Sequence, residues 1–183
     1  MRLYLSLLLL FMVVNSHAQT WQKTNSGIKT TLNKIVVEIE FYNPSTVRII
    51  KSPEGSAFTK KSLSVISTPE KINLSTKQQA DMLVVRSESI SVRCNLTSGA
   101  INFYTNAGTA LLQEKESSTS FKPFNDAGSN TYTVEQAYVL DKDEAIYGLG
   151  QQQKGKMIQR NLILNMVQGN TDDYIPFFQS AKG

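Results

Sequence analysis

Histidine is nearly absent from this 183-residue chain, whose single copy, His17, lies in the N-terminal segment. Histidine is the usual general base near neutral pH and the commonest nitrogen ligand of zinc. If the N-terminal segment is removed, as argued below, no Ser-His-Asp triad, Cys-His pair or histidine-bearing zinc site can form. We expect neither a metal nor a cofactor.

Cysteine is as scarce, with Cys94 as the single copy. One cysteine forms neither an intrachain disulfide nor a cysteine metal cluster. Apolar residues alternate around it, at Ile90, Val92 and Leu96, which is the period of a half-buried strand. We interpret Cys94 as a buried core thiol, because the one nearby cation, Arg93, points to the opposite face.

No apolar run reaches the roughly 20 residues that a membrane-spanning helix needs. Residues 3–14 are almost continuously apolar, follow the positive Arg2 and precede Ser16-His17-Ala18, a small-x-small cleavage signature. We predict that residues 1–18 are a signal peptide cleaved after Ala18, and that residues 19–183 form one domain exported to the periplasm or the extracellular space. We expect no membrane association.

The excess of positive over negative charge is also small, with 19 basic and 15 acidic side chains and a net charge of +4. Along the sequence the basic residues cluster only at Lys60-Lys61 and around Lys154, Lys156 and Arg160. Nucleic-acid binding requires a concentrated basic face. We therefore expect no nucleic-acid partner and interpret these charges as a solvated surface.

Helical periodicity is missing, and short β patterns separated by turns fill the chain. Residues 35–41 alternate apolar and polar side chains, Asn43-Pro44-Ser45 marks a turn, and residues 47–50 return. Short strands with turns every 8–12 residues are typical of an all-β antiparallel sandwich. Further strands are expected at residues 63–66, 71–74, 82–86, 89–96, 100–104, 109–113 and 132–140, with one possible helical turn at 76–80. Near the end of the chain, residues 160–166 and 174–179 are expected to form adjacent strands joined by a loop at 167–173.

Residues 114–131 are rich in Ser, Thr, Asn and Gly and show no clear period. We interpret them as an irregular surface loop. The alternative is an aromatic platform for sugar stacking, which would rest on Phe121 and Phe124.

The most distinctive stretch comes near the end. Tyr147-Gly148-Leu149-Gly150-Gln151 places two glycines around a leucine after a short apolar strand, and glycine inside a strand pattern often marks the close approach of another backbone or a ligand. Uncharged amides follow at Gln152, Gln153, Asn165, Gln168 and Asn170. Amides both donate and accept hydrogen bonds without net charge, which suits a hydroxyl-rich neutral ligand such as a sugar.

These motifs, together with Ile175-Pro176-Phe177-Phe178 and Ser180-x-x-Gly183, resemble the end of the N-terminal, galactose-mutarotase-like domain of glycoside hydrolase family 31. Residues 91–114 are similar to the same domain. The Gly-Leu-Gly-Gln-x-Gln version most resembles bacterial α-xylosidases, since the broader family favours glutamate where this chain has Gln151. The resemblance implies a sandwich that lacks its last strands and a catalytic (β/α)₈ barrel that follows it.

The resemblance also implies which residues meet the substrate. The loop before Ile175 reaches over the barrel in such enzymes, and Gln168, Asn170, Thr171 and Asp172 fall on it. The amides of Gln168 and Asn170 either face the hydroxyls of a xylo- or gluco-oligosaccharide or hold the loop backbone in place. Both roles stay open at this point.

Two acidic pairs are the only internal candidates for glycoside hydrolysis, which uses two carboxyl groups about 5–9.5 Å apart on either side of the bond. Asp172 and Asp173 are adjacent and would point to opposite faces of an extended chain. Asp141 and Asp143 lie in a charged turn. We therefore expect no catalytic residue in this chain.

The combined interpretation is the non-catalytic N-terminal domain of an exported retaining α-glycosidase, an α-xylosidase or an α-glucosidase, whose barrel holds the catalytic aspartates. Alone, the chain is expected to be inactive. The alternatives are a stand-alone carbohydrate-binding or surface-interaction sandwich and a non-functional gene remnant.

Overall fold

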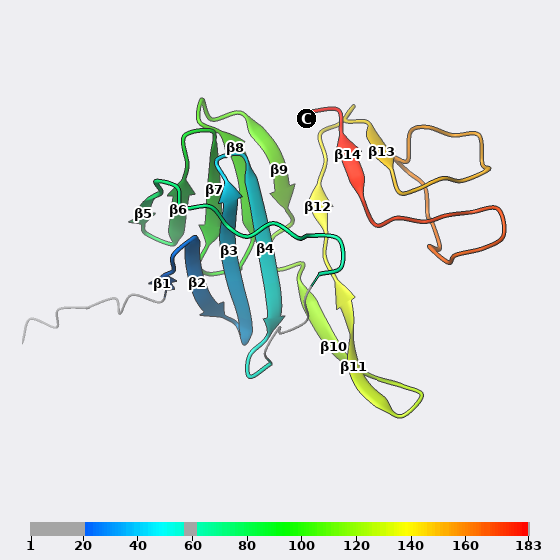
Figure 1. Cartoon of the computed structure of the whole chain (residues 1–183), viewed down its shortest axis with the longest axis horizontal. Helices are drawn as coiled ribbons and strands as arrows, with labels where there is room; N and C mark the ends of the chain where they lie inside the picture. Colours follow the sequence, from blue (N-terminus) through cyan, green and yellow to red (C-terminus); the bar gives the residue numbers. More distant parts are fainter. Residues whose placement is uncertain (1–20, 57–61, 183) are drawn as a thin grey trace, which may run out of the picture.

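The computed structural model describes residues 21–56 and 62–182, and Figure 1 shows them as strands and connecting loops. Every strand pairing in this part of the chain is antiparallel, and no helix is present in it. It follows that no helix of the described residues is long and apolar enough to cross a membrane. The predicted all-β antiparallel fold is confirmed, whereas the proposed signal peptide lies outside the described residues.

One layer of the fold, here called sheet A, is a four-stranded meander in the order β1-β2-β3-β4. Its predicted hairpin is confirmed: the backbone N–H of Ser45 donates to Asn43 Oδ1 at 2.9 Å, which closes the turn from β3 to β4. The strands are β1 (Trp21–Lys23), β2 (Gly27–Leu32), β3 (Ile35–Asn43) and β4 (Thr46–Pro53).

The facing layer, sheet B, has six strands in the order β12-β9-β8-β7-β6-β5. Sequence neighbours pair from β5 to β9, so β5 forms one edge and β12 closes the other. The strands are β5 (Ser75–Gln79), β6 (Met82–Arg86), β7 (Ile90–Asn95), β8 (Ile101–Thr105), β9 (Ala110–Glu114) and β12 (Tyr138–Val139).

The core lies between these two sheets and is built from the inward positions of alternating strands. Cys94 belongs to it, fully buried, and burial raises the pKa of its thiol to about 12. The interpretation of Cys94 as a buried core thiol is confirmed. The other members are Ile28, Leu32, Val37, Ile39, Phe41, Leu83, Val85, Val92 and Ile101.

Several predicted elements are wrong. Residues 63–66 and 71–74 form no strand, and the possible helical turn at 76–80 is strand β5 instead. The single strand expected at 132–140 is interrupted at residues 136–137, where the chain passes from one sheet to another. Local apolar patterns did not reveal these outcomes because strand pairing depends on distant partners.

Residues 114–131 are not an irregular loop, because most of them form a hairpin of β10 (Ser120–Asp126) and β11 (Ser129–Glu135). Phe121 and Phe124 are three residues apart on one strand, so their side chains point to opposite faces. Phe121 instead meets Tyr132 edge-to-face, with ring centroids 6.2 Å apart. A single platform made of Phe121 and Phe124 is therefore ruled out.

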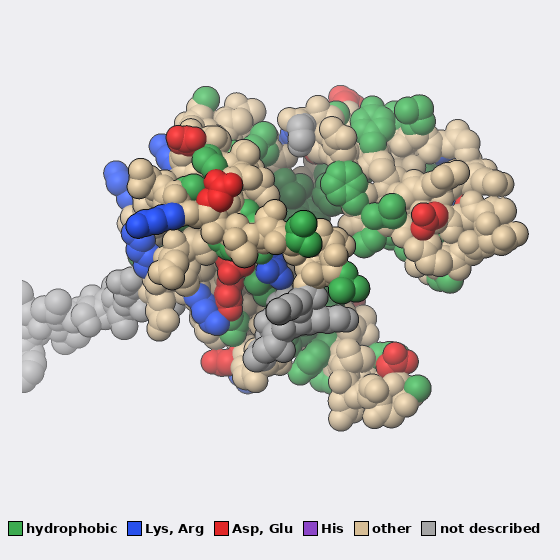
Figure 2. Space-filling model, in the orientation of Figure 1, with side chains coloured by type: hydrophobic (Ala, Val, Ile, Leu, Met, Phe, Trp, Pro, Cys, Tyr) green, Lys and Arg blue, Asp and Glu red, His purple; other side chains and the backbone are tan. Residues whose placement is uncertain are grey.

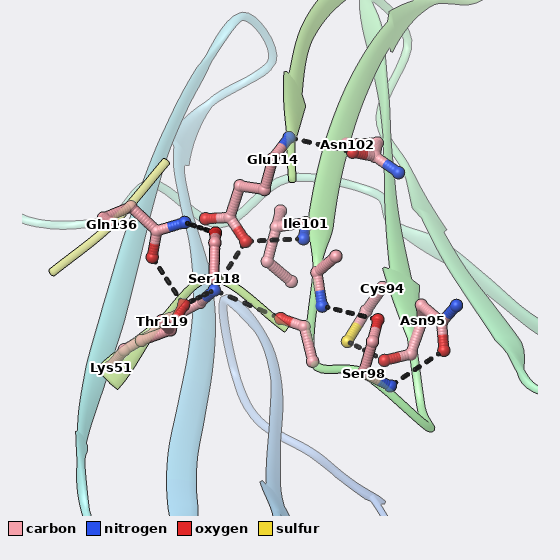
Figure 3. A network of polar contacts seen from close by, with 12 residues as sticks. Lys51, Cys94, Asn95, Ser98, Ile101, Asn102, Glu114, Ser118, Thr119 and Gln136 are labelled. Carbon is pink, nitrogen blue, oxygen red and sulfur yellow. Dashed lines mark hydrogen bonds and ion pairs between the residues drawn. The ribbon is translucent and has the colours of Figure 1, made fainter. Parts of the chain in front are cut away.

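A buried ion pair joins sheet A, sheet B and the base of this hairpin (Figure 3). Lys51 on β4 reaches Glu114 Oε2 on β9 at 2.5 Å, and its ammonium also donates to the Gly99 carbonyl and the Thr119 hydroxyl. The same Glu114 oxygen accepts the backbone N–H of Ile101 at 2.8 Å. All three ammonium donors have acceptors, so this pair satisfies the conditions for a charge pair to persist inside a protein.

Removing one partner of this pair should destabilise the fold strongly. We expect Lys51→Met to lower the free energy of unfolding by about 3–5 kcal/mol, because it leaves the Glu114 carboxylate buried without a cation. Lys29→Met, which breaks the exposed pair with Glu38, should cost less than about 1 kcal/mol. Urea unfolding of the full chain measures both.

The double variant Lys51→Met, Glu114→Leu separates charge from packing. It should recover a large part of the loss, since apolar residues of similar volume often replace buried ion pairs. Equal unfolding midpoints for Lys51→Met and Lys29→Met would contradict the assigned role.

Candidate functional site

The Tyr-Gly-Leu-Gly motif is one half of a crossing between two distant segments. Strand β13 (Ile146–Gly148) pairs with β14 (Phe178–Ser180), and an isolated bridge joins Gln151 to Asp173 with hydrogen bonds of 2.8 and 2.9 Å. Residues 160–166 and 174–179 were predicted to be adjacent strands, and this is wrong. Within the described chain, only the final two residues of the second range enter a strand, and that strand pairs with β13.

The two glycines make this crossing sterically possible. Gly148, Leu149 and Gly150 all have positive φ, at 99°, 63° and 90°, a region that favours glycine. A Cβ on Gly148 would lie 2.7 Å from the Phe177 carbonyl oxygen. A Cβ on Gly150 would overlap the Asp173 carbonyl oxygen and lie 2.7 Å from the Ile175 nitrogen. Among the roles that glycine inside a strand pattern can have, the close approach of another backbone is the one that Gly148 and Gly150 show.

The crossing fixes the C-terminal end of the loop formed by residues 167–173, at Asp173, and Gln168 fixes its interior. The Gln168 side chain donates to the Tyr174 carbonyl at 2.9 Å and accepts the Tyr174 N–H at 2.8 Å. Asp172 Oδ1 accepts the backbone N–H of Gln153 at 3.2 Å. Of the two roles left open for Gln168, holding the loop backbone is the one its contacts display.

Asn170 and Thr171 lie at the tip of this loop. The N–H of Gly169 donates to the Asp172 carbonyl at 3.1 Å, which makes a tight turn with the two residues between them exposed. Across the described residues neither side chain makes a hydrogen bond. Their polar groups are therefore available to a ligand, unlike those of Gln168.

Tyr174 is the buried support under the loop. Its side chain is 7% exposed, and its hydroxyl accepts a hydrogen bond from Lys154 Nζ at 3.0 Å and donates to Asp172 Oδ2 at 3.5 Å. The hydrogen bond to Tyr174 raises the pKa of Lys154, helped by the nearby Asp172 charge. This chain of contacts ties the basic turn after Gly150 to the loop.

Residues 144–182 are here called the lobe, and Glu144 holds its N-terminal end, directly after Asp141 and Asp143 in the charged turn. It is buried, accepts the Ser180 hydroxyl at 2.6 Å and the Asp141 N–H at 2.9 Å, and lies 3.3 Å from Lys182 Nζ. Burial opposes its ionisation, but the hydrogen bonds and Lys182 outweigh burial and leave its pKa below the ordinary value. Nothing in the local sequence marks Glu144, because Ser180 lies 36 residues away.

The sequence profile described as the glycosyl hydrolase 31 N-terminal galactose mutarotase-like domain matches residues 36–181. The chain belongs to this family. An α-xylosidase of Saccharolobus solfataricus is 31% identical over 162 residues, covering 83% of this chain and 22% of that protein. An α-glucosidase of Bacillus thermoamyloliquefaciens is 28% identical over 143 residues, covering 77% of this chain and 17% of that protein.

Solved structures agree on the fold. A family 31 α-xylosidase of Xanthomonas citri superposes with a TM-score of 0.82 at 23% identity, covering 88% of this chain and 18% of that one. A family 31 dextranase of Flavobacterium johnsoniae gives 0.69 at 20% identity, covering 90% and 21%. The chain thus spans about a fifth of the length of these relatives.

Substituting Gly150 tests the crossing. Gly150→Ala should destabilise the lobe by at least about 1–3 kcal/mol, because the added Cβ overlaps backbone and φ is positive. Gly169→Ala is the matched control, since a Cβ there meets nothing within 4 Å. Hydrogen exchange of the Gln151 and Asp173 amides should accelerate only in Gly150→Ala; equal exchange in both variants would contradict the crossing.

Glu144 should give the lobe a pH-dependent stability. Its pKa in the folded chain lies below the ordinary 4.5, so its contribution is complete above about pH 4.5 and is lost as the pH falls through the lowered value. Glu144→Gln should reduce stability at pH 7 and flatten the fall between pH 5 and pH 3, measured by urea midpoints. Asp143→Asn, which alters an exposed neighbour, should change neither; a similar effect in both variants would sink this assignment.

Proposed function

We propose that this chain is the non-catalytic N-terminal domain of an exported retaining α-glycosidase that acts on α-xylosides, with α-glucosides as the second choice. In this proposal the domain supports a catalytic (β/α)₈ barrel and contributes residues 167–173 to the rim of the sugar pocket. The observation that carries it is the loop construction: Gln168 and Asp172 hold the backbone, while Asn170 and Thr171 are exposed at the tip.

The division of roles follows from hydrogen-bond capacity. The Gln168 amide donates one hydrogen bond to the backbone of Tyr174 and accepts another from it, so its role is to position the loop. An asparagine amide and a threonine hydroxyl at the tip offer donors and acceptors that match sugar hydroxyls. Asn170 and Thr171 are accordingly the proposed substrate contacts, and Gln168 and Asp172 the positioning residues.

One member of each acidic pair, Asp172 and Asp141, already has a structural partner. Asp172 accepts hydrogen bonds from Gln153 and Tyr174, and Asp141 pairs with Lys182 at 2.7 Å. A retaining mechanism uses two carboxyl groups about 5–5.5 Å apart, and we assign both to the barrel. The chain alone is then expected to release neither xylose nor glucose.

The surface around β13 and β14 has the apolar character expected of an interface with a partner. Large apolar side chains lie exposed on it, and Figure 2 shows hydrophobic side chains gathered in the same region. Exposed apolar patches of this kind mark interaction sites, and the barrel of the same protein is the proposed partner. The exposed residues are Tyr138, Val139, Tyr147, Met157, Ile158, Ile163, Met166, Val167, Ile175 and Phe177.

The test uses the protein that carries both this domain and a barrel. Asn170→Ala should raise KM for an α-xyloside about three- to tenfold with little change in kcat, which is the loss expected for one hydrogen bond to a neutral ligand. Gln179→Ala, an exposed amide on β14 outside the loop, is the matched control. Unchanged kinetics in Asn170→Ala and in Thr171→Ala would refute the pocket role.

The chain expressed alone addresses the stand-alone alternative. Under the proposal it neither cleaves an α-xyloside nor binds xylo-oligosaccharide measurably, because a loop tip supplies only part of a pocket. Tight oligosaccharide binding without a barrel would favour the carbohydrate-binding sandwich instead.

The proposed signal peptide has its own test. Mass analysis of the exported product should give Gln19 as its first residue if the signal peptide is cleaved after Ala18.

A further inference from the structure

We propose that the outer face of sheet B at its β5 edge binds an acidic polysaccharide, one whose sugar units carry carboxylates. Lys77 on β5, Arg86 on β6 and Arg93 on β7 meet there in a shallow groove of about 380 Å³. This site is separate from the loop of residues 167–173. The loop belongs to the part of the chain that follows β12, and β12 and β5 are opposite edges of sheet B. The groove is also lined by Ser75, Gln79, Met82 and Val84.

Strand register places the three cations on one face. Lys77 pairs with Val84 and Val84 with Arg93, so these side chains form one row across three strands. Arg86 is two residues from Val84 and therefore points the same way. The intervening residues Leu83 and Val85 are fully buried in the core. The cations thus face away from the sandwich interior.

The groove contains three cations and no carboxylate among its lining residues, unlike the paired cations of sheet A. On sheet A, Lys29 lies opposite Glu38 at 2.7 Å and Arg48 lies 3.8 Å from Glu40. Within the described residues Lys77, Arg86 and Arg93 form no ion pair. The unmatched positive charge is what an anionic ligand would complement.

Arg93 is held in a fixed position within this face. Its guanidinium lies 3.9 Å from the centroid of the Tyr104 ring, and Gln113 donates to the Tyr104 hydroxyl at 3.3 Å. A stacked guanidinium keeps its N–H edge for a carboxylate, which it can bind with two parallel hydrogen bonds. The Ser91 hydroxyl, opposite Arg86 and Tyr104, is fully buried and has no hydrogen-bond partner in the described chain.

The surroundings favour a polysaccharide over a membrane or a nucleic acid. Ser75 and Gln79 place a hydroxyl and an amide beside the cations, and both groups pair well with sugar hydroxyls. A membrane-binding face would expose large apolar side chains for insertion, whereas Met82 and Val84 are only partly exposed. Single-stranded nucleic acid needs open aromatic faces, and Arg93 covers Tyr104.

The experiment titrates the full chain with three probes: polygalacturonate, neutral dextran and phosphatidylglycerol–phosphatidylcholine vesicles. We expect binding to polygalacturonate that weakens as NaCl rises, with little binding to dextran or vesicles. Lys77→Gln, Arg86→Gln together should weaken it about fivefold or more, as loss of two exposed charge contacts predicts. This variant leaves the Arg93–Tyr104 stack intact, and circular dichroism checks the fold.

Lys115→Gln, Lys142→Gln is the matched control, because it removes the same charge from exposed positions outside the groove. An equal loss in the control would reduce the binding to general charge attraction and overturn the site. Absence of polygalacturonate binding, equal binding of dextran, or comparable binding of the vesicles would each overturn it too. None of these outcomes bears on the loop of residues 167–173, so the two proposals fail independently.

Discussion

The Lys51–Glu114 ion pair is the joint on which the arrangement of this chain depends. Lys51 comes from sheet A and Glu114 from sheet B, and the Thr119 hydroxyl that completes the cluster stands at the base of the β10–β11 hairpin. Apolar packing between two sheets is tolerant of small sliding, whereas an ammonium with three required acceptors accepts one geometry. Glu114 also ends the strand whose edge receives β12, the segment that leads to the lobe. The pair therefore links the rigid sandwich to the part of the chain that carries the candidate site.

A second constraint, the backbone contact at Gly148 and Gly150, positions the loop of residues 167–173 relative to the motif. Strands β13 and β14 are short, and three backbone pairs hold them together. What fixes the loop is the absence of side chains at Gly148 and Gly150, which lets residues 173–177 lie directly against the motif. Gln168 then replaces backbone pairing with its own amide. A loop anchored in this way can extend polar side chains toward a ligand.

The sequence was informative where structure is local and much less so where it is not. Alternation around Val37, Ile39 and Phe41, and the Asn43 turn, sufficed for the β3–β4 hairpin because its two strands are adjacent in the chain. The glycines of the motif indicated that something approaches the backbone closely, but they did not indicate which segment. Gly148 lies against Phe177, which is far along the chain. Residues 160–166 have the apolar content of a strand yet lie outside any sheet. Lys51 and Glu114, 63 residues apart, have no local signature at all.

The charge pattern shows why composition alone misleads about binding. A net charge of +4 spread along the chain indicates a solvated surface. On sheet A this interpretation fits Lys29 and Arg48, which lie opposite Glu38 and Glu40. On sheet B the same kind of residue, one on each of three neighbouring strands, converges without a counter-charge. The strand register decides whether a cation lies opposite a carboxylate or beside other cations, and the sequence alone does not reveal that register. Under the two proposals made above, the chain has two carbohydrate-directed surfaces: the loop of residues 167–173, which needs a barrel to complete a pocket, and the cationic groove, which needs only sheet B.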